Sequence, residues 1–207
     1  MIIKICGLKK TSDAIAAAEA GADMIGLNFY PPSPRCIDVE TAREISSALP
    51  QAVCKVGLFV NEPVEKILGT ASFCGLDTIQ LHGDVSPEET AQFAGLKIIR
   101  AFSISTQDDL ARLQEAEADY FLLDAEVKGM HGGTGRSFDW TLAAKARGYT
   151  SGKIILAGGL RPGNVAEAIR QGRPDGVDVA SGVETAPGVK STDLIEQFIE
   201  AARAARA

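Results

Sequence analysis

Short runs rich in Val, Ile and Leu alternate along the chain with longer, Ala-rich segments whose apolar residues recur at helical spacing. Eight runs predict strands, at Ile2–Cys6, Met24–Asn28, Lys55–Val60, Thr78–Leu81, Ile98–Phe102, Tyr120–Asp124, Lys153–Ala157 and Gly176–Ala180. The other segments predict helices, at Ser12–Ala20, Val39–Ala48, Val64–Phe73, Pro87–Phe93, Gln107–Glu115, Trp140–Ala146, Asn164–Arg170 and Thr192–Ala205. Asp38, Ser86 and Thr106 stand where side chains cap helix N-termini.

Consecutive strand–helix units of about 26 residues, joined by short connections, favour a closed parallel (β/α)8 TIM barrel. An open doubly wound sheet more often has five or six strands. No Pro/Gly/Ser-rich linker or charge run interrupts the units, so the whole chain, 1–207, is predicted to form one α/β barrel domain. In such a barrel, active-site residues follow the carboxyl ends of the strands.

Composition narrows the possible partners. The chain has 207 residues and a net charge of -6, the wrong sign for a protein that binds nucleic acid. The N-terminus lacks the order of a signal peptide, and no apolar run is long enough for a membrane span, so we expect a cytoplasmic protein. The cysteines form no CxxC pair, and no metal-ligand cluster is present, so free thiols and no metal are predicted.

The first predicted strand alternates Ile3 and Ile5 with Lys4 and Cys6. Alternation places Lys4 and Cys6 on one face, which we predict to be the barrel interior. A buried lysine requires a partner, and Asp178 on the last strand is the carboxylate expected to pair with it. Cys6 is either a small buried hydrophobic residue or, beside this cation, a thiol that acts as a base or nucleophile.

Glycine-rich loops follow the last three predicted strands. Asp124 ends the sixth strand and precedes a loop that contains Gly133, Thr134 and Gly135; Gly158-Gly159 and Ser181-Gly182 follow the seventh and eighth strands. Such loops let backbone N–H groups approach an anion, and barrels commonly bind phosphate there. Because P-loop and dinucleotide fingerprints are absent, we expect the phosphate to belong to a small substrate.

Two further polar residues stand near predicted strand ends. Arg35 lies in a proline-rich loop after the second strand, where a guanidinium is either a surface charge or a ligand for a carboxylate. His82 ends the fourth strand and either contacts substrate or is structural.

The chain closely resembles the phosphoribosylanthranilate isomerase family of tryptophan biosynthesis. The resemblance runs from end to end, through Lys4–Leu8, Pro31–Arg35, Val56–Val60, Gln80–Gly83, Gly132–Gly135, Phe138–Trp140, Leu156–Leu160 and Gly176–Glu184. It implies a cofactor-free Amadori rearrangement of an aldosylamine to a ketose. It also implies that Cys6 is the general base, with a lowered pKa, and that Asp124 is the general acid, with a raised pKa.

Other roles follow from the same resemblance. Arg35 matches the residue that holds the anthranilate carboxylate. The phosphate loops match at Gly133, Thr134, Gly135, Gly158, Gly159, Ser181 and Gly182. Lys4, His82 and Asp178 fall in matching motifs as supporting residues, whereas Ala180 stands where many members have a second serine. A monomer is expected.

Three alternatives compete with this interpretation. The histidine-pathway isomerase runs the same rearrangement on a substrate with two phosphates, but its family has an aspartate at the position of Cys6. A Schiff-base aldolase would need a lysine near a strand end, whereas Lys4 and Lys55 sit early in their strands. A non-catalytic phosphate-binding barrel is the third, and measurable turnover would exclude it.

Overall fold

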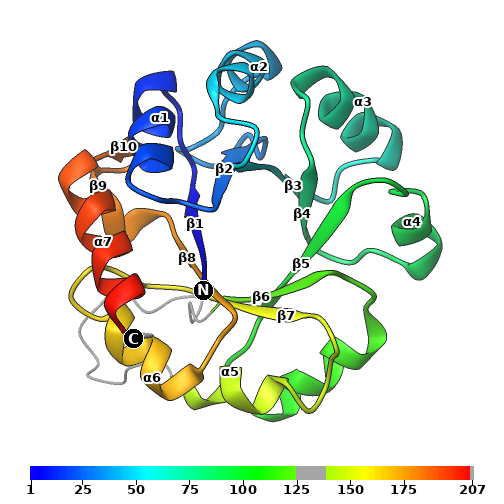
Figure 1. The fold of residues 1–207 in the computed structure, drawn as a ribbon. Helices are drawn as coiled ribbons and strands as arrows, with labels where there is room; N and C mark the ends of the chain where they lie inside the picture. The colour runs from blue at the N-terminus through cyan, green and yellow to red at the C-terminus, as the bar shows by residue number, and fades with distance from the viewer. Residues whose placement is uncertain (125–138, 206–207) are drawn as a thin grey trace.

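In the computed structural model, which describes residues 1–124 and 139–205, eight parallel strands close into a barrel (Figure 1). The strands are β1 (Ile2–Cys6), β2 (Met24–Asn28), β3 (Cys54–Val60), β4 (Thr78–His82), β5 (Lys97–Ser103), β6 (Tyr120–Asp124), β7 (Lys153–Ala157) and β8 (Gly176–Val179). Each strand pairs with its neighbour in sequence, and β8 pairs with β1. The predicted fold class is confirmed.

Helices surround the ring of strands on the outside (Figure 1). They are α1 (Thr11–Glu19), α2 (Val39–Ala48), α3 (Val64–Cys74), α4 (Pro87–Ala91), the 3-10 helix η1 (Asp108–Glu115), α5 (Thr141–Ala146), α6 (Val165–Gly172) and α7 (Thr192–Ala204). We predicted an α-helix where η1 stands. Its buried residues, Leu110 and Leu113, are three positions apart, and a helix of three residues per turn places both on one face.

Side chains cap several of these helices. Asp38 accepts a hydrogen bond from a backbone N–H of α2, and Ser86 forms a reciprocal capping box with Glu89, as predicted. The predicted cap at Thr106 is wrong, because the carboxylate of Asp109 accepts from the Thr106 N–H instead. These two caps determine where the loops after β2 and β4 end and where α2 and α4 begin.

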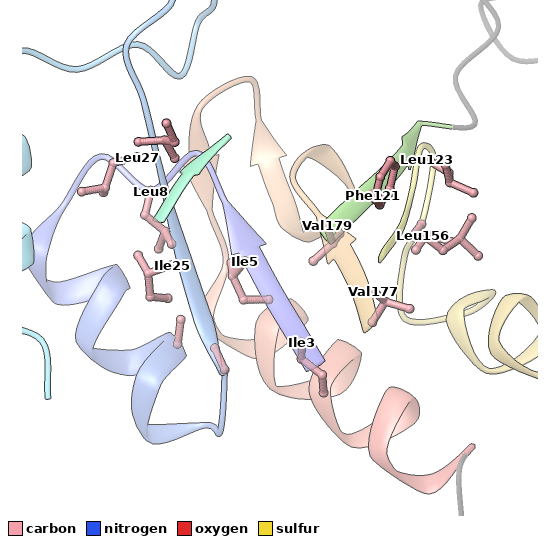
Figure 2. Packing of buried hydrophobic residues seen from close by; sticks show 14 of the residues in the cluster. Ile3, Ile5, Leu8, Ile25, Leu27, Phe121, Leu123, Leu156, Val177 and Val179 are labelled. Carbon is pink, nitrogen blue, oxygen red and sulfur yellow. The ribbon is translucent and has the colours of Figure 1, made fainter. Parts of the chain in front are cut away.

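Alternation along each strand divides the core into two regions. Outward side chains such as Ile3, Ile5 and Ile25 pack between the sheet and the helices (Figure 2). Inward side chains form a smaller apolar cluster inside the barrel, made of Met24, Val56, Ile99, Tyr120, Leu122, Ile155 and Ala157. Lys4 and Cys6 occupy the other face of β1 from Ile3 and Ile5, which confirms the predicted orientation of this strand.

A small hairpin between β8 and α7 was not predicted. After the 3-10 turn η2 (Ser181–Val183), strands β9 (Glu184–Ala186) and β10 (Val189–Lys190) pair antiparallel. Gly188 in its turn has φ +78, and a Cβ there would lie 2.6 Å from the Pro34 carbonyl oxygen. The hairpin therefore packs directly on the loop that follows β2.

Candidate active site

Lys4 and Asp178 form a buried ion pair inside the barrel. The two residues are opposite each other on β1 and β8, and Lys4 Nζ lies 2.8 Å from Asp178 Oδ1. Burial alone would lower the pKa of Lys4, but the charges of Asp178 and Cys6 outweigh it, so this pKa is raised. The predicted pair is confirmed, and it places a permanent ammonium beside the end of β1.

Cys6 is the last residue of β1 and is 5% exposed. Its pKa is raised above the ordinary value because burial disfavours the thiolate and Asp178 adds to that effect, against the opposing charges of Lys4 and Lys190. We predicted a lowered pKa, and that prediction is wrong for the ligand-free site. The charge of Lys4 is largely compensated by Asp178, so it does not offset the desolvation of the sulfur.

Asp124 stands at the carboxyl end of β6 and lines an open cavity of about 1210 Å³. Asn28, Ser33, His82 and Ser103 line the same cavity from neighbouring strand ends and loops. Asp124 and Cys6 therefore stand at the same end of the barrel, because parallel strands present their carboxyl ends together. Gly133, Thr134 and Gly135, which we predicted to bind phosphate, lie outside the described residues.

Arg35 projects from the loop between β2 and α2 onto the end of β1. Gly7 has φ +76, and a Cβ at this position would lie 2.5 Å from Arg35 Cδ, so only glycine fits beneath the arginine stem. The guanidinium donates to both carboxylate oxygens of Glu184, with Nε and one Nη each 2.7 Å away. These two hydrogen bonds hold Arg35 at the barrel mouth, where a guanidinium can bind a carboxylate of a ligand.

The loops after β7 and β8 meet at one side of the mouth. Gly158 and Gly159 both have positive φ, 83° and 62°. Gly182 lies so close to the preceding loop that a Cβ there would come within 1.8 Å of the Leu160 carbonyl oxygen. The structure therefore brings Gly158-Gly159 and Ser181-Gly182 together, as expected for loops that share a ligand.

His82 is the last residue of β4 and contacts the cavity. The side-chain amide of Gln80 lies within hydrogen-bond distance of the ring, with Gln80 Nε2 2.8 Å from His82 Nε2. Burial, reinforced by the charge of Lys4, lowers the pKa of His82 to about 4. His82 is accordingly a neutral hydrogen-bonding group at pH 7.

The sequence did not single out two charged residues, Glu184 and Lys190, that the hairpin brings to the mouth. Glu184 is paired with Arg35 on one side and Lys190 on the other. In a sequence, charged residues that flank a Pro-Gly turn are expected to be exposed. Here the packing of Gly188 on Pro34 buries both side chains.

Among the described residues, no group of His, Cys, Asp and Glu could hold a metal ion. Across residues 1–124 and 139–205, no helix is both long enough and apolar enough to span a bilayer.

Comparisons with known proteins agree along the whole chain. A family model described as N-(5'phosphoribosyl)anthranilate (PRA) isomerase matches residues 3–201. A protein of Rubrobacter xylanophilus named N-(5'-phosphoribosyl)anthranilate isomerase is 48% identical over 204 residues, which cover 97% of this chain and 98% of the relative. One from Magnetococcus marinus with the same name is 46% identical, with 99% and 96% covered.

Solved structures give the same result. Phosphoribosyl anthranilate isomerase from Thermotoga maritima superposes with a TM-score of 0.91 at 43% identity, covering 99% of this chain and 100% of that one. A phosphoribosyl anthranilate isomerase in complex with reduced 1-(o-carboxyphenylamino)-1-deoxyribulose 5-phosphate superposes with a TM-score of 0.88 at 42% identity, with the same coverage. By its sequence from residue 3 to residue 201 and by its barrel, the chain belongs to the N-(5'-phosphoribosyl)anthranilate isomerase family.

Proposed function

We propose that the chain catalyses the Amadori rearrangement of N-(5-phosphoribosyl)anthranilate to 1-(2-carboxyphenylamino)-1-deoxyribulose 5-phosphate, in tryptophan biosynthesis. The observation that carries the proposal is the full-length family match, in a barrel whose β1 and β6 end in Cys6 and Asp124. A thiol and a carboxyl group at one mouth supply a base and an acid for an aldose–ketose isomerisation.

The reaction begins with two proton transfers. Asp124 protonates the ribose ring oxygen, so the ring opens and the C1–nitrogen bond becomes an iminium. Cys6, as the thiolate, then removes the proton from C2, whose acidity the iminium has raised. The resulting enaminol takes a proton at C1 and loses one from the C2 hydroxyl, which gives the ketose. No electrons enter or leave, so the isomerisation needs no redox cofactor.

Electrostatics around Cys6 favour this sequence. In the ligand-free site burial keeps the sulfur protonated, because it raises the pKa of the thiol. An iminium formed beside it adds a positive charge to those of Lys4 and Lys190, and all three favour the thiolate. As the iminium forms, the thiol releases its proton to water in the open mouth, and the thiolate left behind is the base that acts on C2.

The substrate is anionic at both ends, and the mouth offers a group for each. Arg35, which Glu184 holds in place through two hydrogen bonds, binds the anthranilate carboxylate. Backbone N–H groups of Gly158, Gly159, Ser181 and Gly182, together with those of Gly133, Thr134 and Gly135 outside the described residues, bind the phosphate. His82, neutral at pH 7, lines the cavity and offers the substrate a hydrogen-bonding group.

We also infer a cytoplasmic monomer. The four cysteines, all within the described residues, are free thiols, which suits a reducing compartment. A relative from Thermotoga maritima is described as dimeric, so light scattering after gel filtration decides between the two states for this chain.

A steady-state assay tests the reaction itself. Purified protein is mixed with N-(5-phosphoribosyl)anthranilate in EDTA, and the loss of the substrate's fluorescence is followed. We expect turnover that EDTA leaves unchanged. A folded protein that shows no turnover would contradict the proposal. The phosphate loops would then be assigned to the histidine-pathway substrate or to a non-catalytic binding role.

A further inference from the structure

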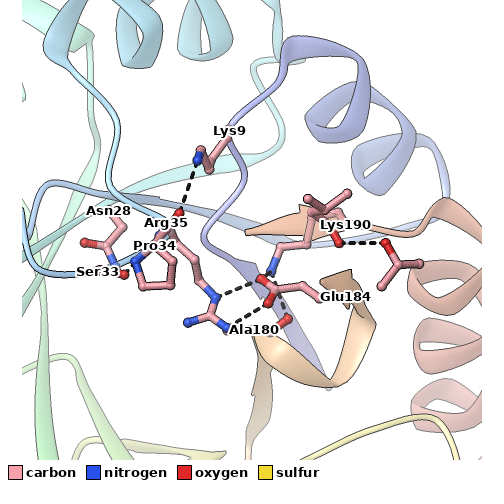
Figure 3. Close-up of polar contacts among 10 residues, drawn as sticks. Lys9, Asn28, Ser33, Pro34, Arg35, Ala180, Glu184 and Lys190 are labelled. Carbon is pink, nitrogen blue, oxygen red and sulfur yellow. Dashed lines mark hydrogen bonds and ion pairs between the residues drawn. The ribbon is translucent and has the colours of Figure 1, made fainter. Parts of the chain in front are cut away.

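A single carboxylate joins two loops at the barrel mouth. Glu184 Oε1 accepts from Arg35 Nε at 2.7 Å and from Lys190 Nζ at 2.8 Å, while Oε2 accepts from an Arg35 Nη at 2.7 Å (Figure 3). Arg35 comes from the loop after β2, whereas Glu184 and Lys190 come from the hairpin after β8. We call these three residues the Glu184 bridge.

The carboxylate at the centre of the bridge is buried between two cations. The Glu184 side chain is 4% exposed and that of Lys190 is 1% exposed. Burial alone would raise the pKa of Glu184, but the hydrogen bonds and charges of Arg35 and Lys190 outweigh it and hold this pKa low.

Lys190 extends the bridge to the turn after β8. Its ammonium also donates to the carbonyl oxygen of Ala180 at 2.8 Å, immediately before Ser181 and Gly182. Lys9 reaches the other side, donating to the Pro34 carbonyl oxygen at 3.1 Å (Figure 3). A continuous chain of contacts therefore runs from Arg35 to the backbone of the Ser181-Gly182 turn.

We propose that Glu184 is a positioning residue that holds Arg35 at a fixed separation from the Ser181-Gly182 turn, so that the site selects ligands with a carboxylate and a phosphate that far apart. The proposal rests on the proposed function, which assigns the carboxylate to Arg35 and the phosphate to the turn. A long arginine side chain loses rotamer entropy when a ligand orders it. A bidentate carboxylate orders it before the ligand arrives.

Binding of two ligands distinguishes this role from a purely structural one, in which Glu184 would stabilise both loops of the barrel mouth and affect every ligand equally. The first is reduced 1-(o-carboxyphenylamino)-1-deoxyribulose 5-phosphate, the compound bound by a solved relative, which carries both anionic groups. The second is the same compound made from aniline, which lacks the carboxylate. Kd is measured by calorimetry for wild type, Glu184→Gln and Glu184→Asp. Glu167→Gln is the control, because Glu167 pairs with Arg170 on exposed α6.

We expect Glu184→Gln to raise Kd for the carboxylate ligand by about tenfold or more and to change Kd for the aniline ligand by less than about twofold. Glu184→Asp, which keeps the charge on a shorter side chain, should restore part of the affinity for the carboxylate ligand. Glu167→Gln should bind both ligands like wild type. Equal losses for the two ligands in Glu184→Gln would overturn the proposal, because support of the whole mouth predicts them.

A double-mutant cycle tests whether Glu184 acts through Arg35. In an Arg35→Ala background, Glu184→Gln should cause no further loss of affinity for the carboxylate ligand, whereas independent effects would multiply and contradict the proposal. If Glu184→Gln does not fold, Glu184→Asp completes the same cycle. None of these measurements needs turnover: a wild type that binds the carboxylate ligand without isomerising substrate contradicts the proposed function and leaves the cycle readable.

Discussion

The sulfur of Cys6 lies against the backbone of Gly26 on the neighbouring strand, so closely that a Cβ on Gly26 would stand 2.8 Å from Sγ and 3.0 Å from Cys6 Cα. Gly26→Ala must therefore displace the thiol from this position. We expect kcat to fall by about tenfold or more with KM within about twofold, because the misplaced group acts in the chemical step. Steady-state kinetics at saturating substrate measure this effect.

Gly69 provides the matched control for that substitution. It lies in the middle of α3, and a Cβ there would meet nothing within 4 Å. Gly69→Ala should leave kcat unchanged and increase the free energy of unfolding by about 0.5–1 kcal/mol, as removal of a helical glycine does. An unchanged kcat in Gly26→Ala would show that the exact position of the Cys6 sulfur is unimportant.

Gly182→Ala should weaken binding of the substrate phosphate. A Cβ at this position would come within 1.8 Å of the Leu160 carbonyl oxygen, so the loops after β7 and β8 must separate. Gly163 lies beyond the same β7 loop, and a Cβ there would meet nothing within 4 Å. We expect KM to rise by about tenfold in Gly182→Ala and to stay unchanged in Gly163→Ala. Equal KM values in the two variants would remove the turn from the phosphate site.

The thiol of Cys6 should titrate above the ordinary cysteine pKa of 9.0 in ligand-free protein, because burial opposes its ionisation. The pH-dependent thiolate absorbance of wild type minus that of Cys6→Ser isolates this group. Lys4→Met should raise the Cys6 pKa further and Asp178→Asn should lower it, because these neighbours have opposite charges. A Cys6 pKa below 9.0 in wild type would reinstate the prediction made from the family resemblance.

His82 should make stability depend on pH between its unfolded pKa of 6.5 and its folded pKa of about 4. In this range the unfolded chain binds a proton that the folded protein excludes, so the contribution is complete above 6.5 and is lost as pH falls towards 4. The loss at pH 4.5 is on the order of 2 kcal/mol. Urea denaturation of wild type and His82→Gln, each above pH 6.5 and at pH 4.5, measures this loss. Equal pH dependences of the free energy of unfolding in the two proteins would disprove the assignment.

The barrel could be predicted from the sequence because eight strand–helix units follow one another without interruption, and the orientation of β1 followed from its alternation. On β1 the period of two places Ile3 and Ile5 outside and Lys4 inside, so even the partner of Lys4 could be inferred from burial of its charge. The direction of the Cys6 pKa shift could not be predicted from the sequence. Its pKa depends on how completely Asp178 neutralises Lys4 and how far water is excluded, and both are properties of packing.

The Glu184 bridge was beyond sequence reasoning for a different reason. Residues 35 and 184 are far apart in the chain, and their contact requires both barrel closure and the hairpin turn at Gly188. The proline-rich loop, a local feature of the sequence, identifies Arg35 as a candidate. Its contact with Glu184 depends on tertiary packing, which the sequence does not show.

In the proposed mechanism, Asp124 makes the proton transfer that opens the ring, and Cys6 makes the one that forms the enaminol. The most direct test is kcat for N-(5-phosphoribosyl)anthranilate in wild type, Cys6→Ser and Asp124→Asn, with far-ultraviolet circular dichroism to establish that all three fold. We predict that each substitution lowers kcat by about 100-fold or more with a small change in KM, as loss of a general acid or base does. A variant that keeps kcat within about threefold of wild type would remove that residue from the mechanism.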